Sequence, residues 1–286
     1  QFYTVGRSFS MWVRADPSSV IHRSIYQPET TLLPLDSENV LSANGTQSVY
    51  MNQVAVYGKR IALTWMYRLE STDGVVRNEG LYLALSDDGG VTWRAHTGQP
   101  INLPVERGSI PPFVKVGSEH QPLNQTSSRF RPDGRLYVTW YAKDDSGRHQ
   151  IFLGILDLAG KLVSAQTVSN SKKTFDLSGR GTLLLPLSRP QIVISGRFVH
   201  VIYRQDGQMV IASQAMVGQG TAWSYMQLDA GDLQAWEPSV SAEYWQQEGR
   251  LMVYVQPARQ NKSDTASVGP AEQASIYEFI ETQVNE

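Results

Sequence analysis

The sequence contains no cysteine among its 286 residues, which excludes disulfides and thiolate metal sites. Charged residues are also scarce, at 18%, and the net charge of −2 gives no electrostatic basis for binding nucleic acid. No apolar run is long enough to span a bilayer, so we expect no membrane partner. The chain begins Gln1-Phe2-Tyr3 without a methionine or a signal peptide. We therefore expect its N-terminal part to be missing.

Apolar and aromatic residues are abundant. Hydrophobic residues make up 41% of the chain, which indicates a globular protein. The 7 Trp and 13 Tyr residues favour both β-strands and surfaces on which sugars stack.

A repeated pattern organises the chain. Each copy is a basic residue followed by alternating apolar positions that include an aromatic, which is typical of a strand. The five copies are Arg7–Arg14, Arg60–Arg68, Arg135–Lys143, Arg197–Arg204 and Arg250–Gln256. Their starts are separated by 53, 75, 62 and 53 residues. Four of them are followed by another apolar strand, which begins near Leu81, Ile151, Met209 or Ser275.

Three or four short strands that recur at this spacing predict an all-β fold, a β-propeller of four-stranded antiparallel blades. We expect about five blades in this chain, forming a single domain over residues 1–286. A large β-sandwich is the alternative fold, but the regular repeats argue against it.

The segment Ser86–Trp93 reads SDDGGVTW and fits the Ser-x-Asp-x-Gly-x-Thr-Trp pattern of an Asp-box. Asp88 can accept backbone N–H bonds across a hairpin turn, Gly90 can adopt a positive φ, and Trp93 can pack into the blade. The motif predicts the outer hairpin of a propeller blade and carries no information about chemistry. Two long connections, Asp16–Ser48 and Gly98–Gln121, are expected to be loops that form walls or lids.

The amino-acid sequences of successive segments resemble those of the BNR-repeat family of sialidase-like propellers. This family includes the ulvan lyases, which are polysaccharide lyases. The segments that carry the resemblance are QFYTVGRSFSMWVR, SVYMNQVAVYGKRIALTW, HQPLNQTSSRFRPDGRLYVTW and WEPSVSAEYWQQEGRLMVYV. The resemblance implies a seven-bladed ring, and the missing blades would precede Gln1. It also implies that the catalytic histidines lie there, contributed by the same protein or by a second chain.

The resemblance implies a secreted or periplasmic enzyme that cleaves a uronate-containing, sulfated glycan such as ulvan by β-elimination. The chemistry needs no cofactor, although a structural calcium or zinc ion is compatible with the resemblance. Where the family often has a metal-binding histidine, this chain has Glu79. A zinc site of that kind is therefore not expected.

A uronate lyase must neutralise the substrate carboxylate before it can remove the weakly acidic C5 proton. Arginine suits this role because its planar fork matches a carboxylate. Arg14 ends a strand, and the resemblance puts the catalytic arginine at this position. Tyr50 opens the next blade and is the second catalytic candidate, although a core tyrosine is an equal alternative. Arg68 and Arg204 end equivalent strands and are weaker candidates.

Further candidates for substrate binding are polar residues at blade openings: Asn52, His120, Asn124, Gln125 and Arg189. The expected partner is an anionic polysaccharide. Three other functions remain open: a sialidase-like hydrolase, a lyase for another rhamnose–glucuronate glycan, and a propeller that binds carbohydrate without cleaving it.

Overall fold

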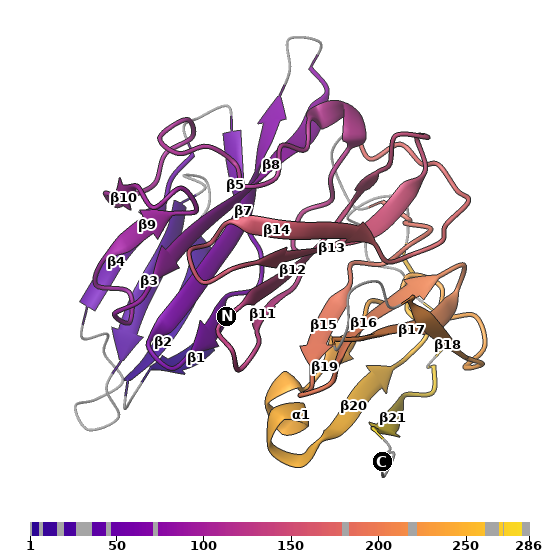
Figure 1. Cartoon of the computed structure of the whole chain (residues 1–286). Coiled ribbons are helices and arrows are strands. Elements are labelled where there is room, and N and C mark those ends of the chain that lie inside the picture. The colour runs from indigo at the N-terminus through magenta and orange to yellow at the C-terminus, as the bar shows by residue number, and fades with distance from the viewer. Residues whose placement is uncertain are drawn as a thin grey trace. The chain divides into compact units, whose positions relative to one another are not determined.

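The computed structural model describes residues 2–5, 8–15, 20–26, 36–43, 47–70, 74–178, 183–216, 222–260, 269–270 and 272–281. Within these ranges the chain forms five β-sheets that follow one another along the sequence (Figure 1). One 3-10 turn and one short helix complete the described elements. No helix in the described residues is long and apolar enough to cross a membrane.

The first sheet has the strand order β1-β2-β3-β4, and each pair is antiparallel. Its strands are β1 (Phe2–Val5), β2 (Ser8–Ala15), β3 (Val20–Tyr26) and β4 (Asp36–Leu41). The prediction of a long loop over Asp16–Ser48 is therefore wrong, because β3 and β4 lie within it.

The sequence concealed β3 because a charged residue occupies one of its inward positions. Arg23 is only 3% exposed. Its guanidinium lies 5.9 Å from the ring centroids of Trp12 and Trp93, donates to the Gly90 carbonyl and pairs with Glu38 of β4. A buried ion pair with these hydrogen bonds replaces the apolar residue that a period-2 pattern would require.

The second sheet has the order β10-β9-β8-β7-β5, with β6 also paired to β7. Its strands are β5 (Gln47–Met51), β6 (Ala55–Tyr57), β7 (Arg60–Glu70), β8 (Val76–Ser86), β9 (Trp93–Ala95) and β10 (Pro100–Ile101). The Gly98–Gln121 connection contains the two-residue strand β10 and is otherwise a long loop that ends close to a 3-10 turn (Ser118–His120). Val105 in this loop bonds to the backbone of Val40 and Ser42.

The Asp-box forms the hairpin between β8 and β9, as predicted. The Asp88 carboxylate accepts hydrogen bonds from the backbone N–H groups of Val91 and Thr92, at 3.0 and 2.9 Å, and from the Thr92 hydroxyl at 2.6 Å. Gly90 has φ = +93°, and a Cβ at this position would overlap the Arg23 guanidinium. The turn therefore needs glycine both for its backbone and for the close approach of β3.

The remaining three sheets follow in chain order. The third contains β11 (Ser128–Phe130), β12 (Leu136–Lys143), β13 (His149–Leu156) and β14 (Leu162–Thr167). The fourth contains β15 (Gln191–Ile194), β16 (Phe198–Gln205), β17 (Gln208–Ala215) and β18 (Ser224–Leu228). The fifth contains β19 (Ser239–Val240), β20 (Arg250–Val255) and β21 (Ser275–Ile280). All five repeated segments are thus strands: β2, β7, β12, β16 and β20.

A short helix, α1 (Ala242–Glu248), lies between β19 and β20 of the fifth sheet. Ser241 caps its N-terminus by accepting a bond from the Tyr244 N–H, and Gly249 ends it with φ = +64°. Trp245 is buried, and its indole N–H donates to the Ile194 carbonyl at 2.9 Å. The helix is too short for a recognisable helical period and depends on its caps and this tryptophan.

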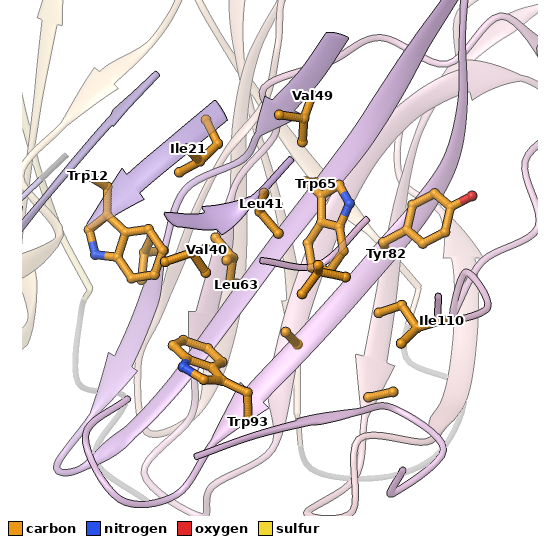
Figure 2. Packing of buried hydrophobic residues seen from close by; sticks show 14 of the residues in the cluster. Trp12, Ile21, Val40, Leu41, Val49, Leu63, Trp65, Tyr82, Trp93 and Ile110 are labelled. Carbon is orange, nitrogen blue, oxygen red and sulfur yellow. The ribbon is translucent and has the colours of Figure 1, made fainter. Parts of the chain in front are cut away.

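The chain divides into two compact units, and the residues of the third sheet are shared between them. The first comprises residues 1–138, 154–165 and 177–179, and the second comprises 139–153, 166–176 and 180–286. The core of the first unit joins apolar residues of the first two sheets with the Gly98–Gln121 loop, including Trp12, Trp65 and Ile110 (Figure 2). The core of the second unit joins β15–β17 with α1, β20 and β21.

Candidate functional site

Two arginines from different sheets converge on Tyr50. Tyr50 lies on β5, and its ring is half-buried. The Arg14 guanidinium carbon, on β2, is 4.8 Å from the ring centroid, and that of Arg68, on β7, is 5.8 Å away. Both guanidinium groups hydrogen-bond to the Tyr50 side chain. The two predicted catalytic residues thus lie in contact, and Arg68 joins them.

The strand register explains why Arg68 reaches Tyr50. Arg68 lies opposite Ser48 of β5 on one side and Asn78 of β8 on the other. Ser48 and Tyr50 are two residues apart, so their side chains share one face of the sheet. Arg68 and Tyr50 are therefore diagonal neighbours across the β5–β7 pair, within reach for long side chains.

The environment of Tyr50 favours its ionised form. Partial burial raises the pKa of the phenol, but the hydrogen bonds and positive charges of Arg14 and Arg68 outweigh this effect, and the pKa is lowered overall. An acidified phenol between two cations can exchange a proton near a bound anion. A guanidinium has five N–H donors, so Arg14 can bond to the phenol and still bind a carboxylate.

Asn52, predicted to bind substrate, holds the protein backbone instead. Its side chain is fully buried. The amide nitrogen donates to the Thr64 hydroxyl at 3.2 Å, and the amide oxygen accepts from the Thr126 N–H at 3.0 Å. The neighbouring Gln53 also bonds to Ser127 and Ser128. A substrate would therefore be affected by Asn52 only through the strand that this residue fixes, two positions from Tyr50.

The loop before β11 carries three other predicted substrate-binding residues. Asn124 is buried and accepts a long hydrogen bond, 3.5 Å, from the Asn78 amide, so it lies beside the cross-strand neighbour of Arg68. Gln125 is exposed and has φ = +64°. His120 is half-exposed, and its Nε2 lies 3.6 Å from the Glu119 carboxylate. Asn124 is thus connected to Arg68, and through Arg68 to Tyr50, because Asn78 bonds to Asn124 and pairs with Arg68.

Arg189 belongs to the second unit, where it pairs with Glu237 at 2.6 Å. Arg204, the other strand-end arginine of that unit, is 4% exposed and donates to the carbonyls of Trp236 and Leu185. Burial lowers its pKa, partly opposed by nearby acidic groups of which Glu237 is the strongest. Arg204 is therefore held in the interior of the second unit by backbone carbonyls.

The residues around Glu79 do not fit a metal site. The Glu79 carboxylate accepts two bonds from Arg107, from Nε at 3.1 Å and from Nη2 at 2.5 Å. Among the described residues, no group of three or more His, Cys, Asp and Glu side chains could hold a metal ion. At the position where the family resemblance suggests a metal-binding histidine, a guanidinium supplies the positive charge.

Arg68 ranked below Arg14 in the sequence because the family resemblance puts the catalytic arginine at Arg14, while Arg68 has only an equivalent strand-end position. The alternation of side-chain direction along β5 contains a signal for Arg68 that this ranking left out. If Ser48 pairs with Arg68, Tyr50 must lie on the same face of the sheet as Arg68. The register between strands cannot be derived from the repeat sequences alone, so the contact between Arg68 and Tyr50 became visible only in the structure.

Solved structures with the same fold are carbohydrate-active enzymes and a protein of unknown function. An ulvan lyase of polysaccharide lyase family PL25, bound to -[GlcA(1-4)Rha3S]-, matches with a TM-score of 0.62 at 12% identity, over 97% of this chain. A Dyadobacter fermentans protein of unknown function matches with a TM-score of 0.51 at 15% identity, over 87% of this chain and 70% of its own. The Bombyx mori β-fructofuranosidase matches with a TM-score of 0.50 at 14% identity, over 97% of this chain and 58% of its own.

This chain spans 63% of the length of the ulvan lyase. No curated protein sequence matches it. The profile of the BNR repeat-containing family matches residues 9–167, which is more than half of the chain. The sheet array and the Asp-box agree with that match, and the chain belongs to the BNR repeat-containing family.

Proposed function

We propose that this protein is a polysaccharide lyase that cleaves a uronate-containing, sulfated glycan of the ulvan type by β-elimination. The observation that carries the proposal is the convergence of Arg14 and Arg68 on the Tyr50 phenol. Fixed cations can neutralise a uronate carboxylate, and an acidified phenol can transfer a proton, as this elimination requires.

In the proposed reaction, Arg14 binds the uronate carboxylate and neutralises its charge, which makes the C5 proton more acidic. Tyr50, ionised to the phenolate that Arg14 and Arg68 stabilise, takes that proton on its oxygen, and the C5–H electron pair forms the double bond between C4 and C5. The C4–O bond breaks, and its electron pair leaves with the oxygen of the departing sugar. Tyr50 returns the proton to this oxygen, so the protein ends the cycle in its starting protonation state.

An anionic glycan is the partner that best fits this cluster, because its carboxylate and sulfate groups match guanidinium donors. The likeness to an ulvan lyase supports the choice of glycan at the level of fold. A polymer of this kind is degraded outside the cytoplasm, so we propose a secreted or periplasmic location.

We propose further that the five sheets are blades of one β-propeller domain. Their order along the chain, the Asp-box hairpin in the second sheet and the likeness to the ulvan lyase support this arrangement. On the family resemblance, the complete ring has about seven blades. The additional blades would come from the same protein or from a second chain.

The same cluster favours one rival function. Sialidases also combine several arginines, which bind a carboxylate, with a tyrosine that acts as the nucleophile. Hydrolysis by this route adds water to the cleaved bond and forms no double bond. The chemical nature of the product therefore separates the two functions.

The test is to incubate the whole protein with ulvan and to follow both near-ultraviolet absorbance and the release of reducing ends. Unsaturated uronate ends that absorb and increase together with reducing ends support the proposal. Reducing ends without absorbance indicate a hydrolase. Binding without either signal indicates a carbohydrate-binding protein. Absorbance with only a different rhamnose–glucuronate glycan changes the substrate and leaves the reaction in place.

A pair of tyrosine variants sharpens the assay. Tyr50→Phe removes only the hydroxyl group and should slow the lyase by about 100-fold or more, because proton transfer is lost. Tyr57→Phe is the matched control, because Tyr57 is 47% exposed at the end of β6. The control should retain full activity. Equal turnover by the two variants would exclude Tyr50 from the reaction.

A further inference from the structure

The backbone of Arg68 is fixed because β7 is paired with a strand on each side. Arg68 is the ninth residue of the eleven-residue strand β7 and is paired on both sides, with Ser48 of β5 and Asn78 of β8. Its guanidinium lies 5.8 Å from the Tyr50 ring centroid and hydrogen-bonds to the phenol. A strand with neighbours on both edges is a more rigid support for such a contact than a loop.

The direction of the two hydrogen bonds at Tyr50 follows from chemistry. An arginine guanidinium has only donors, so the phenol oxygen must be the acceptor from both Arg14 and Arg68. The proton of the phenol must therefore point away from both guanidinium groups. Each of these bonds becomes stronger when the oxygen is negatively charged.

The other charged groups near Tyr50 do not offset the positive charges of Arg14 and Arg68. β3 packs against β5 and carries His22 and Arg23. Arg23 is engaged with Glu38 and the Gly90 carbonyl. His22 is half-buried and lies opposite Val13 of β2.

On the far side of β7, β8 carries Arg77 and Glu79. Glu79 is paired with Arg107, so its charge is offset locally. Glu70 follows Arg68 by two residues and pairs along the sheet with Val76. Arg14 and Arg68 are the charged groups that lower the pKa of Tyr50.

We propose that Arg68 is a positioning residue that, together with Arg14, holds the Tyr50 oxygen as a hydrogen-bond acceptor, so that Tyr50 can take the substrate proton. The inference rests on the proposed lyase function. The proposal assigns a different role to each of the two arginines. Arg14, which is exposed, meets the carboxylate. Arg68, which is anchored in the sheet, orients the phenol and stabilises its negative charge.

The experiment titrates Tyr50 directly and needs no substrate. The whole protein is labelled with ¹³C at the ζ carbon of tyrosine, and the Tyr50 resonance is assigned with Tyr50→Phe. In the unchanged protein this resonance should titrate below the ordinary tyrosine pKa of about 10. Arg68→Met should raise the pKa of Tyr50 by about one unit, and Arg68→Lys by less, because the charge remains while the fork is lost.

Arg77→Met is the matched control. It removes one positive charge from the same sheet, but Arg77 pairs with Leu69 and so lies on the opposite face from Arg68. Its Tyr50 titration should match that of the unchanged protein. Thermal melting checks that each variant is folded. If Arg68→Met fails to fold, Arg68→Gln replaces it, because glutamine retains a donor without the charge.

A titration of Tyr50 that is identical in the unchanged protein and in folded Arg68→Met would overturn the inference, whatever the activity. The pH profile of activity gives the second readout. Under the proposal, the acid side of the profile moves to higher pH in Arg68→Met, by the same amount as the phenol titration. If the phenol titration shifts as expected but the unchanged protein forms no unsaturated product, the lyase function fails while the role of Arg68 at Tyr50 stands.

Discussion

Replacing His149 with phenylalanine should make the protein more resistant to acid. His149 begins β13, and its side chain is fully buried. The imidazole lies 5.5 Å from the Tyr141 ring and 6.2 Å from the Phe175 ring. Neither ring nitrogen hydrogen-bonds to another described residue. A proton added to this imidazole would place a charge in an aromatic pocket.

Burial lowers the pKa of His149, the positive charge of Lys143 lowers it further, and Asp176 and Asp144 act in the opposite direction, with a net value of about 4. In the unfolded chain the pKa of histidine is about 6.5. The unfolded state therefore binds more protons between these two values, and folding stability falls as pH decreases from about 6.5 towards about 4. Between about pH 7 and about pH 5 the loss is about 2 kcal/mol.

The assay is urea denaturation at both pH values. The unchanged protein should lose about 2 kcal/mol of unfolding free energy through His149, in addition to smaller losses from other groups. His149→Phe should remove that part of the loss, because phenylalanine can pack against Tyr141 and Phe175 without titrating. His120→Gln is the control, since His120 is half-exposed, and it should keep the full loss. A His149→Phe protein as sensitive to acid as the unchanged one would refute the reasoning.

Three further changes test the other structural assignments. Asp88→Ala should lower the unfolding free energy by about 1–2 kcal/mol and leave turnover unchanged, because Asp88 only caps the Asp-box turn. A large fall in turnover at an unchanged melting temperature would contradict this. Arg14→Ala should slow the proposed elimination by about 100- to 1,000-fold without changing the melting temperature, and a well-folded variant with normal turnover would remove Arg14 from the site. Asn52→Ala should cost about 2–3 kcal/mol in a denaturation experiment, because the Thr126 N–H and the Thr64 hydroxyl lose a buried partner. A loss below about 0.5 kcal/mol would show that water or a rearranged loop replaces it.

The strands that the sequence revealed are those with a dense run of apolar and aromatic residues. β7 reads RIALTWMYRLE, and all seven of its residues from Ile61 to Tyr67 are buried. Aromatic and β-branched side chains at such positions identify a strand without further information. The Asp-box was equally readable, because its hydrogen bonds are local and span only a few residues.

The features that the sequence concealed depend on partners far along the chain. Arg23 is buried because Glu38 and the Gly90 carbonyl accept its hydrogen bonds, and no local pattern announces such acceptors. Asn52 looked like a binding residue because it is polar and opens a blade, yet its amide is bonded to Thr64 and Thr126. Arg14 was found by family resemblance and Tyr50 by its position at the opening of a repeat, and their contact could not be derived from spacing alone.

The Asp-box turn also matters for anyone who wishes to modify this protein. Asp87, at a variable position of the motif, pairs with both Arg60 and Arg94. These two arginines donate to carbonyl groups of the turns that flank β12 and β13, at Gly134, Leu158 and Ala159. A tag or a foreign epitope that is inserted into the Asp-box turn, or into one of these flanking turns, would therefore also weaken the contacts of the other. Val91, at the tip of the hairpin, has its side chain 80% exposed and is the better position for attaching a label.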